Sequence, residues 1–131
     1  MIIQMKIAIL IALLLGGFSV TGAQSADFAV SELKLGPDGF LEVHLCNRAA
    51  ERIHLADEVM EKAFLTVSIQ DVPRAEYKLK YIPAVLFAPG GKTVIKTNFR
   101  FSQSVKVTAV VNIPSIIPES RTQDNRLTRF L

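Results

Sequence analysis

The chain has 131 residues, of which 50% are hydrophobic, with a net charge of +3 and one cysteine. This length accommodates one domain. So small a charge does not indicate a nucleic-acid-binding protein. A single cysteine cannot form an intramolecular disulfide, so packing and backbone hydrogen bonds must stabilise the domain.

The first 23 residues have the pattern of a secretory signal peptide. Lys6 precedes an uncharged stretch over residues 7–20, and small residues follow at 21–23. The apolar stretch is shorter than the roughly 20 residues that span a membrane, so a cleaved signal is favoured over a membrane anchor. We expect cleavage after about Ala23, export to the periplasm or the extracellular space, and one mature domain over residues 24–131 without a transmembrane segment.

Most of the mature chain alternates apolar and polar residues, as strands with one buried face do. The segments with this pattern are 27–35, 40–47, 64–71, 75–82 and 105–112. Strands of parallel sheets would show continuous apolar runs instead. The pattern therefore predicts antiparallel sheets.

Glycine and proline separate these segments at short intervals. Residues 36–39 (Gly-Pro-Asp-Gly) and 88–91 (Ala-Pro-Gly-Gly) are predicted tight turns, the second leading into a strand over 92–101. Short strands at regular spacing with turn signals between them indicate an all-β sandwich or barrel.

The first strand, 27–35, changes its apolar parity part way along. Phe28 and Val30 share one parity, and Leu33 and Leu35 share the other. A β-bulge near residues 31–32 would explain the change and would let one strand take part in both sheets.

Residues 48–63 break the alternation. Ile53, Ala56, Met60 and Ala63 are spaced by three and four residues, with charged residues between them. This spacing predicts a short amphipathic helix over about 54–63, inserted between two strands.

Four blocks carry a resemblance to a known family. They are ADFAVSELKL (26–35), FLEVHLCN (40–47), LFAPGGKTV (86–94) and KVTAVVNIPSIIPESRTQDNRL (106–127). Together they resemble the CARDB domain (cell-adhesion-related domain found in bacteria), and the last block is the most specific. The chain departs from the family in having Asn-Ile-Pro at 112–114 in place of aspartates, and in the length of the 48–63 insert. The resemblance implies an immunoglobulin-like β-sandwich of about seven strands, usually without enzymatic activity and often part of a larger surface protein.

Glu42, His44 and Cys46 share one strand face, and His54 follows in the insert. These ligand types suit zinc or copper. However, three ligands along one strand are spread over about 13 Å, too far to close a tetrahedral site. We favour a partly solvated face with Cys46 as a small buried thiol, and an intermolecular disulfide through Cys46 remains an alternative.

Basic residues form a second candidate site. Lys78, Lys80, Lys96 and Arg100, with Lys92 nearby, could make a cationic face for anionic glycans or lipid headgroups. More often such residues form a solvated outer face, and lysines on an edge strand also prevent unwanted pairing. The solvated face is the favoured interpretation.

Residues 116–126 (IIPESRTQDNR) combine carboxylates with turn-forming residues. Glu119, Asp124 and Asn125 offer oxygen ligands, but calcium needs six to eight and no D-x-D-x-D spacing is present. We favour a connection in which Pro118 prevents ladder pairing and Glu119, Asp124 and Asn125 bond turn amides.

The sequence contains neither a G-x-S-x-G nor an H-E-x-x-H motif. We therefore expect a non-catalytic, exported, adhesion-like binding module without a cofactor, whose partner is a protein or a cell-surface glycan or lipid. Two alternatives stay open. One is a structural subunit or homo-oligomer that assembles through edge strands or a Cys46 disulfide. The other is a small periplasmic metal-binding protein that uses His44, Cys46 and His54.

Overall fold

A computed structural model of the chain describes residues 26–113, 117–119 and 125–131. The predicted signal peptide lies outside these residues. The elements, in order, are β1 (Phe28–Leu35), β2 (Leu41–Asn47), α1 (Asp57–Lys62), β3 (Phe64–Ile69), β4 (Val72–Lys78), the 3-10 helices η4 (Leu79–Tyr81) and η5 (Ala84–Phe87), β5 (Lys92–Lys96), β6 (Lys106–Ile113) and β7 (Arg126–Phe130).

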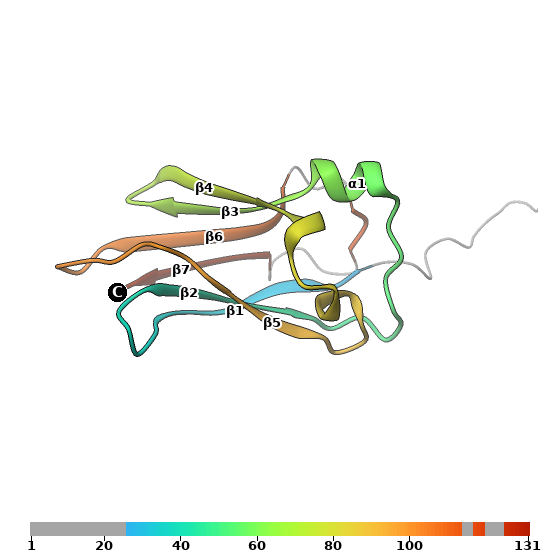
Figure 1. Cartoon of the computed structure of the whole chain (residues 1–131), viewed down its shortest axis with the longest axis horizontal. Helices are drawn as coiled ribbons and strands as arrows, with labels where there is room; N and C mark the ends of the chain where they lie inside the picture. The colour runs from blue at the N-terminus through green and yellow to red at the C-terminus, as the bar shows by residue number, and fades with distance from the viewer. Residues whose placement is uncertain (1–25, 114–116, 120–124) are drawn as a thin grey trace, which may run out of the picture.

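The strands form two stacked sheets (Figure 1). One sheet has the order β1-β2-β5 and the other β4-β3-β6-β7, and every neighbouring pair is antiparallel. The predicted fold class, an antiparallel β-sandwich with one short helical insert, is confirmed.

The core lies between the sheets, where alternate residues of β2, β3 and β6 point inward. The inward residues at its centre are Leu41, Val43, Leu45, Leu65, Val67, Val107, Ala109 and Val111, and each is at most 1% exposed. The period-two pattern thus corresponds directly to burial on one face.

The bulge predicted in β1 is confirmed, because the pairing with β2 shifts between Val30 and Glu32. The bulge does not, however, let the strand take part in both sheets as predicted. Among the described strands β1 pairs with β2 alone, so it does not serve both sheets. The extra residue at the bulge lets side chains of both parities point into the core, since Val30 before the bulge and Leu33 after it are both buried.

Two predicted strands are shorter than expected. The segment 75–82 leaves the sheet after Lys78 and continues as η4, in which Leu79 is fully buried. The segment 92–101 ends as a strand at Lys96. In both cases the chain must cross from one sheet to the other, and a crossing segment cannot stay paired within its own sheet.

The helix α1 is also shorter than the predicted 54–63, and none of its residues is buried. Ile53 and Ala63, two members of the predicted apolar stripe, are buried but lie outside the helix. Ile53 sits in irregular chain, where its N–H donates to the carbonyl of Phe87 at 2.9 Å. The flanking chain therefore supplies the buried anchors of the insert.

Candidate functional site

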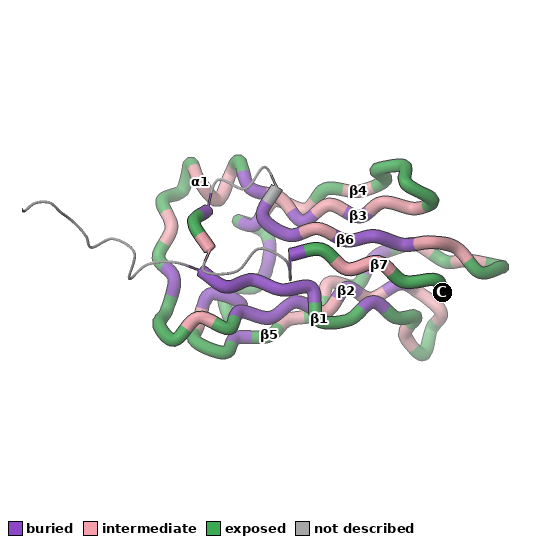
Figure 2. Tube along the Cα trace, turned by 180° about the vertical axis from the view of Figure 1, so that it is seen from behind, coloured by how far each residue is buried: buried purple, intermediate pink, exposed green. Residues whose placement is uncertain are grey.

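The two long sides of the sandwich differ. On one side β1 packs against β6 and β7 (Figure 2). On the other side the edge strands β4 and β5 face each other (Figure 1), and the structure has a hollow there.

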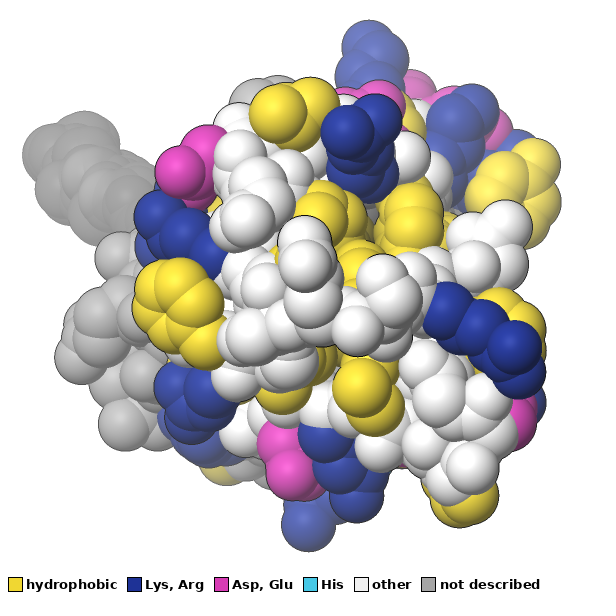
Figure 3. Space-filling view, turned by 90° about the vertical axis from the view of Figure 1, so that its left-hand side faces the viewer, with side chains coloured by type: hydrophobic (Ala, Val, Ile, Leu, Met, Phe, Trp, Pro, Cys, Tyr) yellow, Lys and Arg dark blue, Asp and Glu magenta, His cyan; other side chains and the backbone are white. Residues whose placement is uncertain are grey.

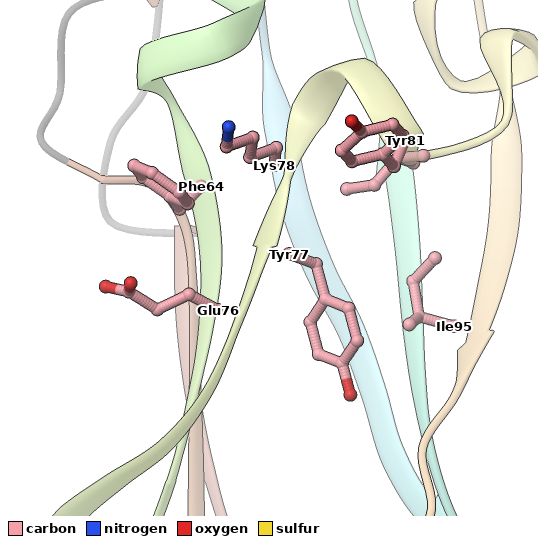
Figure 4. Close-up of a pocket in the computed structure, with 7 residues that line it drawn as sticks. Phe64, Glu76, Tyr77, Lys78, Tyr81 and Ile95 are labelled. Carbon is pink, nitrogen blue, oxygen red and sulfur yellow. The ribbon is translucent and has the colours of Figure 1, made fainter.

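This hollow has a volume of about 460 Å³ and is lined by Phe64, Glu76, Tyr77, Lys78, Tyr81, Ile82 and Ile95. Figure 4 shows Tyr77, Tyr81 and Ile95 on one side of β4, and Phe64 and Glu76 on the other. Tyr77 lies opposite buried Leu65 in the β3–β4 pairing, so its ring points between the sheets. Most of the lining is aromatic or aliphatic.

Two further hollows adjoin the first because they share lining residues with it. Tyr77 also lines a hollow of about 430 Å³ beside Phe40 and Lys96. Ile82 also lines one of about 350 Å³ beside Phe87. We call the first hollow, around Tyr77, Tyr81, Ile82 and Ile95, the β4–β5 groove. Viewed from the end with the β1–β2 and β3–β4 turns, apolar side chains gather centrally and basic ones lie around them (Figure 3).

The two tyrosines give the β4–β5 groove a polar component. Tyr77 is partly buried, and this burial raises the pKa of its hydroxyl above the usual 10.0. The hydroxyl is therefore protonated at neutral pH and can donate a hydrogen bond. Tyr81 is 73% exposed, so most of its ring surface is available for contact with a partner beside the hollow.

The predicted cationic residues fall into two clusters instead of one stripe. In the first cluster Lys78 and Lys80 both form ion pairs with Glu61 of α1. Hydrogen bonds from the two ammonium groups lower the pKa of Glu61 to about 2. Lys80 also lies over the Tyr81 ring, with its Nζ 5.4 Å from the ring centroid.

The second cluster surrounds the 36–39 turn. Lys96 forms an ion pair with Asp38, and its hydrogen bond lowers the pKa of that carboxyl group. Arg100 donates to the carbonyl of Asp38 at 2.9 Å and stacks over the Phe40 ring at 4.4 Å. Each cluster therefore combines two basic side chains with one carboxylate and keeps a net positive charge.

The four candidate metal ligands, Glu42, His44, Cys46 and His54, do not gather into one site. His44 Nε2 contacts Glu42 Oε1 at 3.2 Å, and His44 and Cys46 line a separate hollow of about 420 Å³. His54 lines the hollow beside Ile82 instead. Within the described part of the chain, no three His, Cys, Asp or Glu side chains are grouped so as to hold a metal ion.

Glu119 occupies the centre of a polar network. Its Oε1 accepts from the N–H of Phe28 at 2.8 Å, and its Oε2 accepts from the amide groups of Asn112 and Asn125, both at 2.5 Å. Asn112 has a positive φ of 65°, and its amide also donates to the carbonyl of Ile117 at 2.9 Å. Glu119 thus links β1 to the chain that connects β6 and β7.

The other residues of this turn agree with a structural interpretation. Ile117 is 3% exposed and anchors the turn in the core. The carbonyl of Pro118 accepts from the N–H of Ala26 at 3.0 Å. Asp124 lies outside the described residues. The sequence pattern predicted Asn125 in the turn. It did not predict the hydrogen bond from Asn112 to Glu119, because Asn112 lies seven positions earlier within β6.

Two stacked antiparallel sheets of three and four strands define an immunoglobulin-like β-sandwich. No family model and no curated protein sequence matches the chain.

Solved structures do match. The fold is similar to the crystal structure of the CARDB domain of the PF1109 protein from Pyrococcus furiosus in complex with di-metal ions. The TM-score is 0.57 and the identity 16%, over 82% of this chain and 93% of that one. The solution NMR structure of the same domain gives a TM-score of 0.52 and 15% identity, over 82% and 90% of the two chains. The predicted resemblance to a CARDB domain is therefore confirmed at the level of the fold.

Among the residues that the structure describes, no helix is both long and apolar enough to cross a membrane.

Proposed function

We propose that this protein is a non-catalytic, exported binding module and that its partner binds in the β4–β5 groove. One observation carries the proposal: Tyr81 is 73% exposed at the margin of an aromatic and aliphatic hollow of about 460 Å³. Aromatic residues are enriched in protein interfaces, where a large rigid surface is buried at a small cost in side-chain entropy.

Two features support a role in binding without catalysis. The groove is lined mainly by apolar side chains, while His44 and Cys46 line a different hollow. The similar fold of the CARDB domain is the second feature. The di-metal ions of that domain are not transferred to this chain, because the described residues offer no matching group of ligands.

Export is part of the proposal and rests on the pattern of residues 1–23. The mass of the protein isolated from producing cells tests it directly. We expect the mass of a chain that begins at about Gln24, and the mass of the complete chain would contradict cleavage.

Site-specific photo-crosslinking tests the groove. A photoreactive amino acid would replace Tyr81 in one variant and Phe130 in the other. Both side chains are aromatic and 73% exposed, but Phe130 lies on β7, at the far edge of the four-stranded sheet from β4. We expect adducts from position 81 on illumination of producing cells, and few from position 130. Equal yields from both positions would contradict a partner site in the groove.

A further inference from the structure

We infer that the partner in the β4–β5 groove is an extended peptide segment that adds as a strand to the free edge of β5. Its alternate side chains are apolar and enter the groove, and the others are acidic and lie on the outer face. This inference rests on the proposed function and specifies the chemistry of the partner.

The backbone of β5 offers the hydrogen bonds. In the β2–β5 pairing, Asn47 N–H donates to Gly91 at 2.8 Å and Thr97 N–H donates to Leu41 at 2.9 Å. Antiparallel pairs alternate between bonded and non-bonded positions, so the N–H and C=O groups of Lys92, Val94 and Lys96 point away from β2. Among the described strands β5 pairs with β2 alone. These three residues therefore present an unpaired row.

The sandwich has room for an added strand at this edge. The β5 sheet has three strands and the facing sheet has four. Tyr77 of β4 and Ile95 of β5 both lie in the space between these two strands (Figure 4), beside the free edge of β5. Side chains at alternate positions of an added strand would contact Tyr77 and Ile95 and fill the hollow.

The two lysines of β5 favour a partner with acidic side chains. Val94 is 46% exposed on the outer face, between the exposed Lys92 and Lys96. Pairing of two β5 strands about Val94 would place Lys92 opposite Lys96, and like charges directly opposite are destabilising. A second copy of the chain is therefore disfavoured at this edge, whereas acidic side chains at the same positions are favoured.

The free edge of β5 can pair with only a short peptide. β5 has five residues, or about 17 Å at the usual rise. The 88–91 turn precedes it, and residues 97–105 then cross toward β6 (Figure 1). A segment of roughly five to seven residues therefore fits.

Selection from a random heptapeptide library displayed on phage, against the purified protein, tests the inference. We expect enriched peptides that alternate apolar and other residues, with Asp or Glu among the latter. Their affinity should fall at least tenfold for Val94→Pro and for Tyr77→Ala, and should stay unchanged for Phe130→Ala. Proline at position 94 removes an outward N–H while leaving the bonds to β2 in place. Circular dichroism and thermal unfolding would establish that each variant is folded.

Lys92→Glu provides a second test that leaves the backbone unchanged. It should weaken the acidic peptides severalfold. In the unchanged protein, amide exchange at Lys92, Val94 and Lys96 should slow when an enriched peptide binds. A failure to enrich peptides, enrichment without alternation, or full affinity for Val94→Pro would overturn strand addition. If cross-links from Tyr81 persist while these tests fail, the groove still binds a partner, but not as a strand.

Discussion

At the scale of single residues, Glu119 shows how a side chain that suggests ligand binding serves the fold. Both of its carboxylate oxygens already accept hydrogen bonds from Phe28, Asn112 and Asn125. These donors come from three separate parts of the chain. The residue therefore stabilises the contact between the first strand and the last connection.

Glu119→Ala should lower the free energy of unfolding by about 2 kcal/mol, because it leaves partly buried donors without an acceptor. Urea unfolding measures the change. Glu32→Ala is a matched control, since Glu32 is an exposed carboxylate on β1 and its loss should change stability by at most about 0.5 kcal/mol. Equal effects of the two substitutions would contradict the structural role of Glu119.

The pH dependence of stability provides a separate test. Burial raises the pKa of Glu119 above its usual 4.5, and the nearby Asp27 carboxylate adds to the rise, against the opposing effect of the hydrogen bonds. A folded-state pKa above the unfolded value contributes stability that is present at low pH and is lost as pH rises through the folded pKa.

Glu119→Gln removes this titration. The stability of the unchanged protein relative to Glu119→Gln should therefore be greater near pH 4 than near pH 7. Urea unfolding of both proteins across this range measures the difference. A difference that grows with pH would show that the folded protein prefers the ionised carboxylate.

At the scale of elements, the 88–91 turn sets the position of β5. Gly90 has a positive φ of 67° in open space, while a Cβ at Gly91 would lie 1.9 Å from the carbonyl oxygen of Val85. The two glycines are thus required for different reasons, one by backbone conformation and the other by close packing against η5.

Gly90→Ala should cost about 1 kcal/mol because of its left-handed conformation. Gly91→Ala should cost at least about 3 kcal/mol, because backbone atoms must move to admit the methyl group. Thermal unfolding of the two variants measures both effects under the same conditions. Similar losses would mean that the chain near Val85 moves easily.

At the scale of the whole molecule, Cys46 distinguishes a monomeric module from a disulfide-linked assembly. Cys46 is a free thiol that is 8% exposed. We expect it to react with a thiol reagent at least about tenfold more slowly in the folded protein than in denaturant. The denatured protein is the internal control.

Size-exclusion chromatography with light scattering completes that test. The mass should be the same with and without reductant if the thiol stays buried. Rapid reaction in the folded state, together with a dimer that reductant dissociates, would instead support assembly through Cys46.

Much of the fold could be predicted because burial on one face leaves a period-two pattern. This pattern located β2, β3 and β6, and the parity change of β1 located its bulge. The ends of β4 and β5 could not be predicted in the same way. Tyr81 continues the alternation of Tyr77 and Leu79, yet it is 73% exposed, because the crossing between the sheets ends the strand first.

The candidate site was less predictable. The sequence indicated basic residues at 78, 80, 96 and 100, but the carboxylates that form ion pairs with the lysines, Glu61 and Asp38, are distant along the chain. Such ion pairs depend on which helices and strands lie side by side, and this arrangement is set where the chain crosses from one sheet to the other. The groove was missed for the same reason.

The class of the fold, the inward face of most strands and the turns between them could be predicted from the chain alone, since these follow from local patterns of burial and backbone preference. The folded arrangement was needed to show that β4 and β5 share one side, that this side has an aromatic groove, and that the edge of β5 is unpaired beside it. Those features depend on contacts between segments far apart in the chain, which no local pattern encodes.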